Sequence, residues 1–303
     1  MNRKSAFLTT TMGVCLTAMV CCALWGSAFP CIKIGYQLFQ IDGNDISSQL
    51  LFAGCRFTLA GLLTILLGSL MNRRPLIPRK TSWIRIAKLS LFQTVIQYLF
   101  FYVGLAHTTG VKASIIEASN VFVAILIASL IFRQEKLDKH KIIGCIAGFA
   151  GVVLININQS GLDMSLSLTG EGFILLSTIA YAVSSVLIKI YSREDNPVML
   201  SGWQFLLGGI IMILCGYLTG GSVSVWTAPS ISMLFYLAAV SAVAYSLWVI
   251  LLKLNPVSKV AVFGFMNPVF GVILSALLLG EGQQAFGLTA IGALVLVCIG
   301  IYI

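Results

Sequence analysis

Charged side chains are scarce in this chain of 303 residues, of which 10% are Asp, Glu, Lys or Arg and 58% are apolar. A soluble globular protein carries about 25% charged residues, so the composition excludes an ordinary soluble domain. Histidine is also rare, and His107 and His140 have no cluster of metal ligands beside them. No G-x-x-x-x-G-K-[ST] loop occurs, which excludes ATP hydrolysis by that motif. We therefore expect a membrane protein without cofactor or metal.

Pairs of residues suited to covalent catalysis are also missing. No Ser or Cys has a His or a paired Asp on a neighbouring turn, so the sequence predicts that the chain is not an enzyme. The eight cysteines lie in apolar segments without a CxxC pair and are interpreted as small core residues. An intramembrane enzyme or a membrane scaffold is retained as the most distant alternative to transport.

Long apolar runs are abundant, and the mean hydropathy is +0.98. A membrane-spanning helix needs about 20 mostly apolar residues. Ten stretches qualify: 12–33, 48–71, 83–102, 111–132, 141–157, 169–191, 198–218, 231–251, 260–279 and 285–302. The sequence therefore predicts an all-α polytopic membrane protein with ten transmembrane helices.

The basic residues indicate an orientation, because Lys and Arg accumulate on cytoplasmic loops. With the N-terminus in the cytoplasm, all of the 19 basic residues except Lys33, Arg56 and Lys112 fall on the cytoplasmic side. The net charge of +9 is then a topology signal spread over short loops, and we expect no nucleic-acid partner. We expect a multi-pass protein of the cell membrane, surrounded by the lipid bilayer, with both termini cytoplasmic.

Residues of the second half repeat those of the first at nearly fixed distances. A spacing of 147 residues joins Tyr98 to Tyr245, Lys112 to Lys259, Asn120 to Asn267, Thr94 to Ser241 and Phe101 to Trp248. Spacings of 156 and 148 residues join Trp25 to Tyr181 and Arg56 to Gln204. The matched positions share helix faces, so we interpret them as the trace of a duplicated unit.

Each predicted half contains five crossings, and an odd number makes the second copy enter the membrane from the opposite side. The halves, residues 1–158 and 159–303, are therefore predicted to be inverted five-helix repeats. When two inverted copies exchange conformations, an inward-open state becomes an outward-open state. The pattern thus favours a carrier that works by alternating access around a central cavity.

Four segments resemble a known family: ALWGSAFPCIKIG (23–35), CRFTLAG (55–61), GVKASIIEASNVFVAILIASLIFRQEKL (110–137) and SKVAVFGFMNPVFGVILSALLLGEG (258–282). Over nearly its whole length the chain resembles the EamA type of the drug/metabolite transporter superfamily. The resemblance implies ten helices in a five-plus-five inverted repeat, with a cavity lined by helices one to four and six to nine. It also implies transport of small metabolites, amino acids among them.

Arg56 and Glu117 are ionisable residues inside predicted membrane helices, where a charge costs about 2.5 to 3.5 kcal/mol or more. They lie at similar depth, so they could meet. One interpretation is an ion pair that locks the second helix to the fourth. A second is a clamp for a zwitterion, in which Arg56 holds a carboxylate and Glu117 an ammonium group. A third makes Glu117 a proton carrier.

An amphipathic cavity of aromatic and amide side chains would suit a small organic molecule. Tyr98 and Tyr245 lie near mid-helix, and Gln93 and Gln97 lie one turn apart beside the same face. We predict a secondary active transporter of amino acids or related amphipathic compounds, without a metal. The predicted substrate-binding residues are Trp25, Arg56, Gln93, Gln97, Tyr98, Phe101, Glu117, Asn120, Tyr181, Trp203, Gln204, Tyr245, Trp248 and Asn267.

Two further interpretations concern matched lysines and small residues. Lys112 and Lys259 either reach toward opposite membrane interfaces or bind an anion, so an anion or sugar-phosphate exchanger is the alternative transport function. Gly144, Gly148 and Gly151 form a small-residue stripe on the fifth predicted helix. We expect that a homodimer could form through helices five and ten, which the resemblance places at the periphery.

Overall fold

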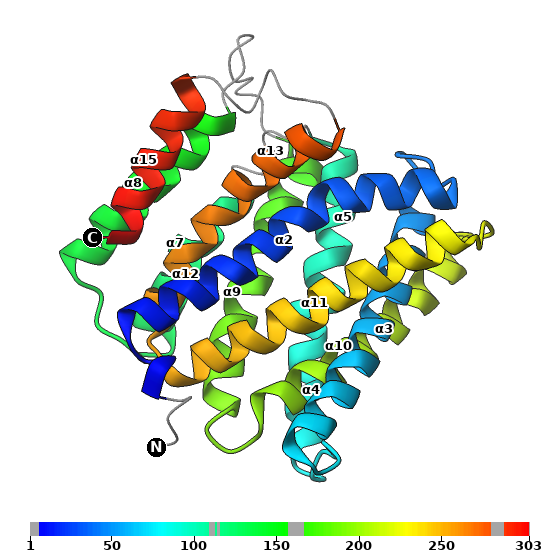
Figure 1. Cartoon of the computed structure of the whole chain (residues 1–303), viewed down its shortest axis with the longest axis horizontal. Coiled ribbons are helices and arrows are strands. Elements are labelled where there is room, and N and C mark those ends of the chain that lie inside the picture. Colours follow the sequence, from blue (N-terminus) through cyan, green and yellow to red (C-terminus); the bar gives the residue numbers. More distant parts are fainter. Residues whose placement is uncertain (1–5, 109–112, 114–115, 157–166, 280–287, 303) are drawn as a thin grey trace.

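The structure, a computed structural model, describes residues 6–108, 113, 116–156, 167–279 and 288–302. These residues form helices and connecting turns, with no strand among them (Figure 1). Six helical runs in the described part are long and apolar enough to cross a membrane. The expectation of an all-α membrane protein is therefore confirmed.

The helices follow the predicted apolar stretches. The six long runs are α2 (Thr11–Phe39), α3 (Ile46–Asn72), α4 (Ser82–Ser90) continued by η1 (Leu91–Ile96) and α5 (Gln97–Ala106), η3 (Leu168–Gly172) continued by α9 (Phe173–Tyr191), α10 (Pro197–Leu218) and α11 (Ala228–Leu254). The remaining described helices are α7 (Asn120–Leu126) with η2 (Ile127–Ile131), α8 (Lys139–Asn156), α12 (Val257–Ala261) with η4 (Val262–Phe265) and α13 (Met266–Leu279), and α15 (Leu288–Tyr302). The count of ten crossings stays a prediction.

Polar side chains define where long helices begin. The Asp45 carboxylate accepts a hydrogen bond from the Ser48 amide at 3.0 Å, before the apolar run of α3. Asn196 accepts one from the Val198 amide at 2.9 Å, and Pro197 occupies the first turn of α10, where no amide hydrogen is needed. These caps matter because an apolar membrane leaves a helix to satisfy its own backbone groups.

Helices α3 and α10 approach each other through glycine. A Cβ on Gly54 would lie 2.9 Å from the Gly209 carbonyl oxygen, and one on Gly61 would lie 2.7 Å from the Gly202 carbonyl oxygen. Residue numbers rise along α3 while they fall along α10, so the two helices are antiparallel. Small residues allow this close backbone contact without help from the hydrophobic effect, which lipid does not supply between helices.

Helices α8 and α15 form a second close pair at one side of the bundle (Figure 1). A Cβ on Gly300 would lie 2.5 Å from the Gly148 amide nitrogen and 2.6 Å from the Gly144 carbonyl oxygen. The small-residue stripe of α8 is therefore used within the chain. A homodimer through these helices stays a prediction and would use other faces, on which Ile146 and Val295 are exposed.

The long helices of the two predicted halves are interleaved. Helix α2 packs against α11 and α13, and Figure 1 shows it running between them. Helix α9 in turn packs against α5 and α7. Each predicted half thus contributes one helix that lies against two helices of the other half. The centre of the bundle is built by residues far apart in the sequence.

The turns at one end of the bundle contain Arg73, Arg74, Arg79, Lys80, Arg133, Lys136 and Arg193. We call this end the basic end; its turns are residues 73–81, 132–138, 192–196 and 255–256. The N-terminal end of α2 and the α3–α4 and α9–α10 turns all lie toward the lower part of Figure 1. Arg79 forms an ion pair of 2.9 Å with Asp195, which joins two of these turns. Arg193 hydrogen-bonds to Gln134, which joins a third.

Candidate functional site

Aromatic rings from five helices meet in the middle of the bundle. The Trp25 ring lies 4.9 Å from that of Tyr245 and 5.0 Å from that of Trp248, both edge-on. The Phe57 ring lies 4.5 Å from that of Tyr98. We call this group the central aromatic cluster; it consists of Trp25, Phe57, Tyr98, Phe205, Tyr245 and Trp248.

Most of the predicted aromatic site residues belong to this region. Tyr181 of α9 and Phe101 of α5 pack at its edge, and the Phe101 ring lies 5.6 Å from that of Tyr102. Trp203 does not join them. Its indole nitrogen donates to the Leu76 carbonyl at 2.7 Å, so the structure places Trp203 against the α3–α4 turn.

Two members of the cluster are absent from the predicted set. The Phe57 and Phe205 rings stack at 5.3 Å with an interplanar angle of 11°. They are 148 residues apart, the same spacing that joins their neighbours Arg56 and Gln204. The repeat spacing is therefore the signal that would have found them.

Arg56 lies buried beside the cluster, with 5% of its surface exposed. Its Nε and Nη2 atoms donate to the Ser241 hydroxyl at 3.2 Å and 2.9 Å, and its guanidinium lies 5.3 Å from the Phe57 ring centre. Although Glu117 is also in the described part, no ion pair joins it to Arg56. The ion-pair interpretation is therefore wrong for this conformation, because the guanidinium turns toward α11.

A second buried contact repeats the first. Thr94 donates a hydrogen bond of 2.8 Å to Gln204 Oε1, and both side chains are fully buried. Thr94 corresponds to Ser241 in the repeat, and Gln204 corresponds to Arg56. The same pair of matched positions therefore meets twice, each time between the two predicted halves.

Thr94 lies in η1, a stretch of π-helix that the sequence spacing did not predict. Short π-helical turns inside α-helices are frequent at functional sites because they shift side chains relative to a regular helix. Gln93, also in η1, is 3% exposed, and Gln97 in the next turn is 8% exposed. The irregular turn thus carries the predicted amide side chains into the interior.

Several predicted site residues carry buried polar atoms that have no hydrogen-bond partner among the described residues. Buried polar groups are nearly always hydrogen-bonded, so each of these atoms is available to a water molecule or to a ligand. The atoms are Trp25 Nε1, Gln93 Oε1, Gln97 Oε1, Gln204 Nε2 and Asn267 Oδ1. They comprise two donors and three acceptors.

Glu117 and Asn120 belong to the segment that contains α7. Glu117 is half-buried and within electrostatic range of Tyr102 and Tyr245. A Cβ on Gly264 would lie 3.7 Å from Asn120 Oδ1, so α7 faces η4 at this level. Within the described residues, no three His, Cys, Asp or Glu side chains gather in a way that could hold a metal ion.

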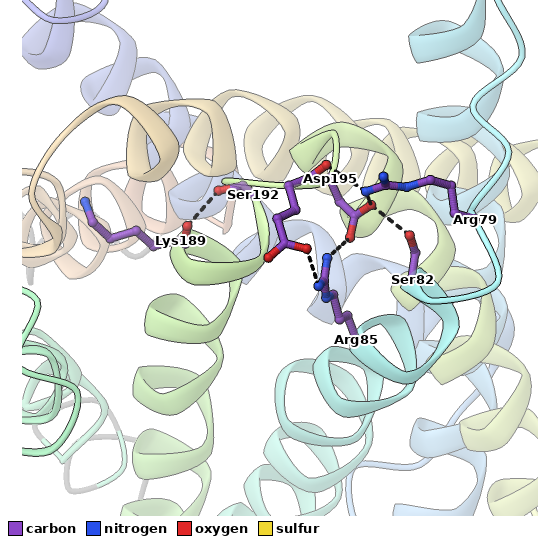
Figure 2. A network of polar contacts seen from close by, with 7 residues as sticks. Arg79, Ser82, Arg85, Lys189, Ser192 and Asp195 are labelled. Atoms are coloured by element: carbon purple, nitrogen blue, oxygen red, sulfur yellow. Dashed lines mark hydrogen bonds and ion pairs between the residues drawn. The ribbon is translucent and has the colours of Figure 1, made fainter.

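A polar network at the basic end joins the α9–α10 turn to α4 and the turn before it (Figure 2). The Asp195 carboxylate, with 2% of its side chain exposed, accepts hydrogen bonds from Arg79 at 2.9 Å, Ser82 at 2.7 Å and Arg85 at 2.7 Å. Burial alone would raise the pKa of Asp195, but these three donors outweigh it and lower the pKa below its usual value. Sequence analysis did not identify this network.

A second carboxylate at the basic end makes a similar connection. Glu135, with 6% of its side chain exposed, accepts hydrogen bonds from the Ser258 amide at 3.1 Å and from the Ser258 hydroxyl, and lies 3.1 Å from Lys141 Nζ. Burial raises the pKa of Glu135, but the Ser258 and Lys141 contacts together lower it. The loop after η2 is thereby tied to the start of α12.

The structure shows the position of only one of the two matched lysines, Lys112 and Lys259. Lys112 lies outside the described residues. Lys259 is half-buried at the basic end, and its Nζ donates to the Thr9 carbonyl at 3.2 Å. It also lines a cavity of about 640 Å³ that lies at this end of the bundle, away from the central aromatic cluster.

The sequence profile of the EamA-like transporter family matches the chain twice, over residues 12–157 and 168–303. The chain belongs to the EamA-like transporter family. An uncharacterized transporter of Archaeoglobus fulgidus is 30% identical to this EamA-like chain over 287 residues, which cover 92% of the chain and 93% of the relative. The resemblance proposed from the sequence motifs is therefore confirmed.

Two further similarities extend this family assignment. A protein of Salmonella typhimurium named as a probable amino-acid metabolite efflux pump is 25% identical over 316 residues, covering 100% of the EamA-like chain and 95% of the relative. A solved protein structure superposes on the EamA-like chain with a TM-score of 0.76 at 18% identity, over 96% of both chains. The similarity to this solved structure shows a shared fold.

Proposed function

We propose that this EamA-like transporter is a secondary active carrier built from two inverted five-helix repeats, residues 1–158 and 159–303, with ten transmembrane helices. The observation that carries the proposal is the pair of reciprocal buried contacts. Arg56 meets Ser241, and the matched Gln204 meets Thr94. A two-fold relation between the halves generates such reciprocity, because each contact between positions i and j then has a partner between j and i.

Packing at larger scale supports the same relation. Helix α2 lies against α11 and α13, while α9 lies against α5 and α7. Phe57 stacks on its counterpart Phe205. Two inverted units joined at such an axis can exchange conformations by rocking, which is the basis of alternating access. In this proposal the central aromatic cluster lies between the rocking halves.

The contacts at the basic end join the two proposed halves, so they would have to separate for the carrier to open at that end. Asp195 and Ser258 belong to the second proposed half, whereas their partners Arg79, Arg85 and Glu135 belong to the first. We infer that these contacts hold the basic end closed and separate when the carrier opens there. Following the bias of basic residues toward the cytoplasm, we place this end and both termini in the cytoplasm, in the plasma membrane of the cell.

The proposed substrate is an amino acid or a related zwitterion with an apolar part. Arg56 supplies a buried cation that suits a carboxylate. Glu117, with the unpartnered oxygens of Gln93 and Asn267, suits an ammonium group. The aromatic rings suit an apolar side chain. The name of the Salmonella relative is consistent with this substrate class.

Counterflow in proteoliposomes tests the proposal. Vesicles that contain the purified chain and an unlabelled apolar amino acid should accumulate the labelled amino acid from outside, and its decarboxylated amine analogue should compete poorly. Replacing the guanidinium in Arg56→Gln should reduce amino-acid exchange about tenfold or more while exchange of the amine changes little. The charge-matched control is Lys80→Gln, at an exposed position on the basic end.

Three outcomes are decisive for this function. Saturable exchange that depends on Arg56 and not on Lys80 supports it. Absence of counterflow for every amino acid tested contradicts a carrier of this class. Preferential exchange of phosphorylated sugars that is lost in Lys259→Gln would instead favour the anion exchanger.

A further inference from the structure

The cavity of about 640 Å³ at the basic end has a charge pattern that the transport proposal does not use. It is lined by the ends of α8, α9, α11, α12 and α15 and by the start of α2. Four of its lining residues are lysines and two are carboxylates. The lysines are Lys141, Lys189, Lys253 and Lys259, and the carboxylates are Glu135 and Asp138.

Only part of this positive charge is neutralised inside the protein. Lys141 pairs with Glu135 at 3.1 Å. Lys189 and Lys259 are half-buried and donate to backbone carbonyls, of which the Thr9 carbonyl is 3.2 Å from Lys259 Nζ. Lys253 is exposed. No ion pair joins Lys189, Lys253 or Lys259 to a carboxylate within the described residues, although Lys189 lies within electrostatic range of Glu135.

Lysines near the ends of helices are common because the carbonyl ends attract cations. That effect accounts for Lys189 at the end of α9 and for Lys253 at the end of α11. It does not account for four lysines against two carboxylates around one cavity. An anion in the cavity would balance this excess of positive charge.

The inner wall of the cavity is apolar. Val14, Ile125, Cys145 and Phe263 line it, and all four are buried. The lining extends from the helix ends to about two turns inside them, a depth of about 10 Å. A basic rim above an apolar wall, at the end of membrane helices, fits an amphiphile that carries a negative charge at one end.

We propose that this cavity binds an anionic phospholipid, with the phosphate among Lys189, Lys253 and Lys259 and the start of an acyl chain against the apolar wall. Basic pockets between membrane helices on the cytoplasmic side are suited to such headgroups. The bound lipid would bridge α8 and α15 to the rest of the bundle. This inference does not depend on the identity of the transported substrate.

Native mass spectrometry of the full chain, delipidated in detergent, tests the proposal. The probes are phosphatidylglycerol, phosphatidylcholine with the same acyl chains, and inorganic phosphate. We expect retention of phosphatidylglycerol over phosphatidylcholine, and an affinity about fivefold lower for phosphatidylglycerol in Lys253→Gln. The variant Lys253→Gln removes an exposed charge without a partner in the described part of the chain, so it should leave folding intact.

Two further variants separate charge from shape. Thr11→Trp, at an exposed position on the cavity rim, should block the cavity and reduce phosphatidylglycerol binding without changing net charge. Lys80→Gln removes a charge from the same end outside the cavity and should change nothing. The proposal is overturned if both lipids bind equally, if Lys80→Gln weakens binding as much as Lys253→Gln, or if inorganic phosphate displaces the lipid with equal affinity.

Discussion

Arg56 donates two hydrogen bonds to Ser241, and this buried contact spans 185 residues of sequence. It holds α3 against α11 beside the central aromatic cluster. The serine hydroxyl offers an acceptor to a charge that is 5% exposed. A single hydroxyl does not neutralise a guanidinium, so Arg56 keeps a positive charge that an anionic group of a substrate can meet.

Removal of this hydroxyl should weaken the fold. We expect Ser241→Ala to lower the free energy of unfolding by about 1 to 3 kcal/mol, because it leaves buried donors of Arg56 without their acceptor. Chemical unfolding in detergent micelles measures the change. Ser232→Ala, on an exposed face of the same helix, is the control and should stay within about 0.5 kcal/mol of the parent. Equal effects of the two substitutions would contradict the prediction.

The α3–α10 contact should not tolerate a methyl group. A Cβ on Gly209 would lie 2.4 Å from the Thr58 amide nitrogen, and the backbone there cannot move aside easily. We expect Gly209→Ala to lower the free energy of unfolding by about 1 to 3 kcal/mol. At Gly43, where no atom lies within 4 Å of an added Cβ, the same substitution should be nearly neutral. A neutral Gly209→Ala would show that the two helices pack less closely than described.

The Asp195 network should make stability depend on acid pH. Because the pKa of Asp195 is lower in the folded state than the unfolded value of about 3.9, its stabilisation is complete above that value and is lost as the pH falls through the folded pKa. We expect Asp195→Asn to cost about 1 to 2 kcal/mol at neutral pH and to lose less stability between pH 5 and pH 3 than the parent does. Melting temperatures over this pH range measure both effects. The control Asp42→Asn, on an exposed turn, should keep the parental slope.

Replacement of Trp25 by Phe should affect substrate exchange, whereas replacement of Trp203 by Phe should affect stability. In Trp25→Phe the lost indole N–H has no partner in the described protein, so we expect weaker substrate exchange with little loss of stability. In Trp203→Phe the lost N–H is the donor to the Leu76 carbonyl, so we expect lower stability with unchanged substrate preference. Half-saturation concentrations and melting temperatures, measured on both variants, separate the roles. A loss of affinity in Trp203→Phe alone would move the site toward the basic end.

Glu117 is the residue on which to test proton coupling. If it carries the proton, Glu117→Gln should abolish the stimulation of transport by a pH gradient. If it only binds the ammonium group of the substrate, exchange at equal pH should fall while the stimulation persists. Uptake with and without an imposed gradient measures this. Glu194→Gln removes a carboxylate that is 66% exposed and should keep the parental response. Unchanged pH-driven uptake in Glu117→Gln would exclude Glu117 as the carrier.

Much of the candidate site could be predicted from sequence because duplication leaves a fixed spacing between matched residues. Tyr98 and Tyr245 were found in this way, and both lie in the central aromatic cluster. Trp203 was predicted as one of the aromatic substrate-binding residues, yet its indole N–H donates to the Leu76 carbonyl in the α3–α4 turn. Hydropathy predicts that a segment forms a membrane helix. It does not predict which face of that helix points to the site when the helix is apolar on most sides.

The ion pairs and hydrogen bonds at the basic end were not predictable from the sequence, for a different reason. Asp195 and Arg79 lie in short turns with ordinary polar composition, and 116 residues separate them. Nothing local distinguishes them from charges that face only water. Their meeting depends on how α4, α9 and α10 are arranged around the core, and the same is true of Glu135 and Ser258.

The sequence by itself determined that this protein is helical and apolar enough for a membrane, because those properties follow from local composition and length. It also determined the pairs of matched positions, because duplication is a property of spacing. Only the tertiary structure decided that Arg56 meets Ser241 and not Glu117, and that Gln204 meets Thr94. Such choices depend on the rotation and close approach of helices, which side chains far apart in the sequence settle together when they pack.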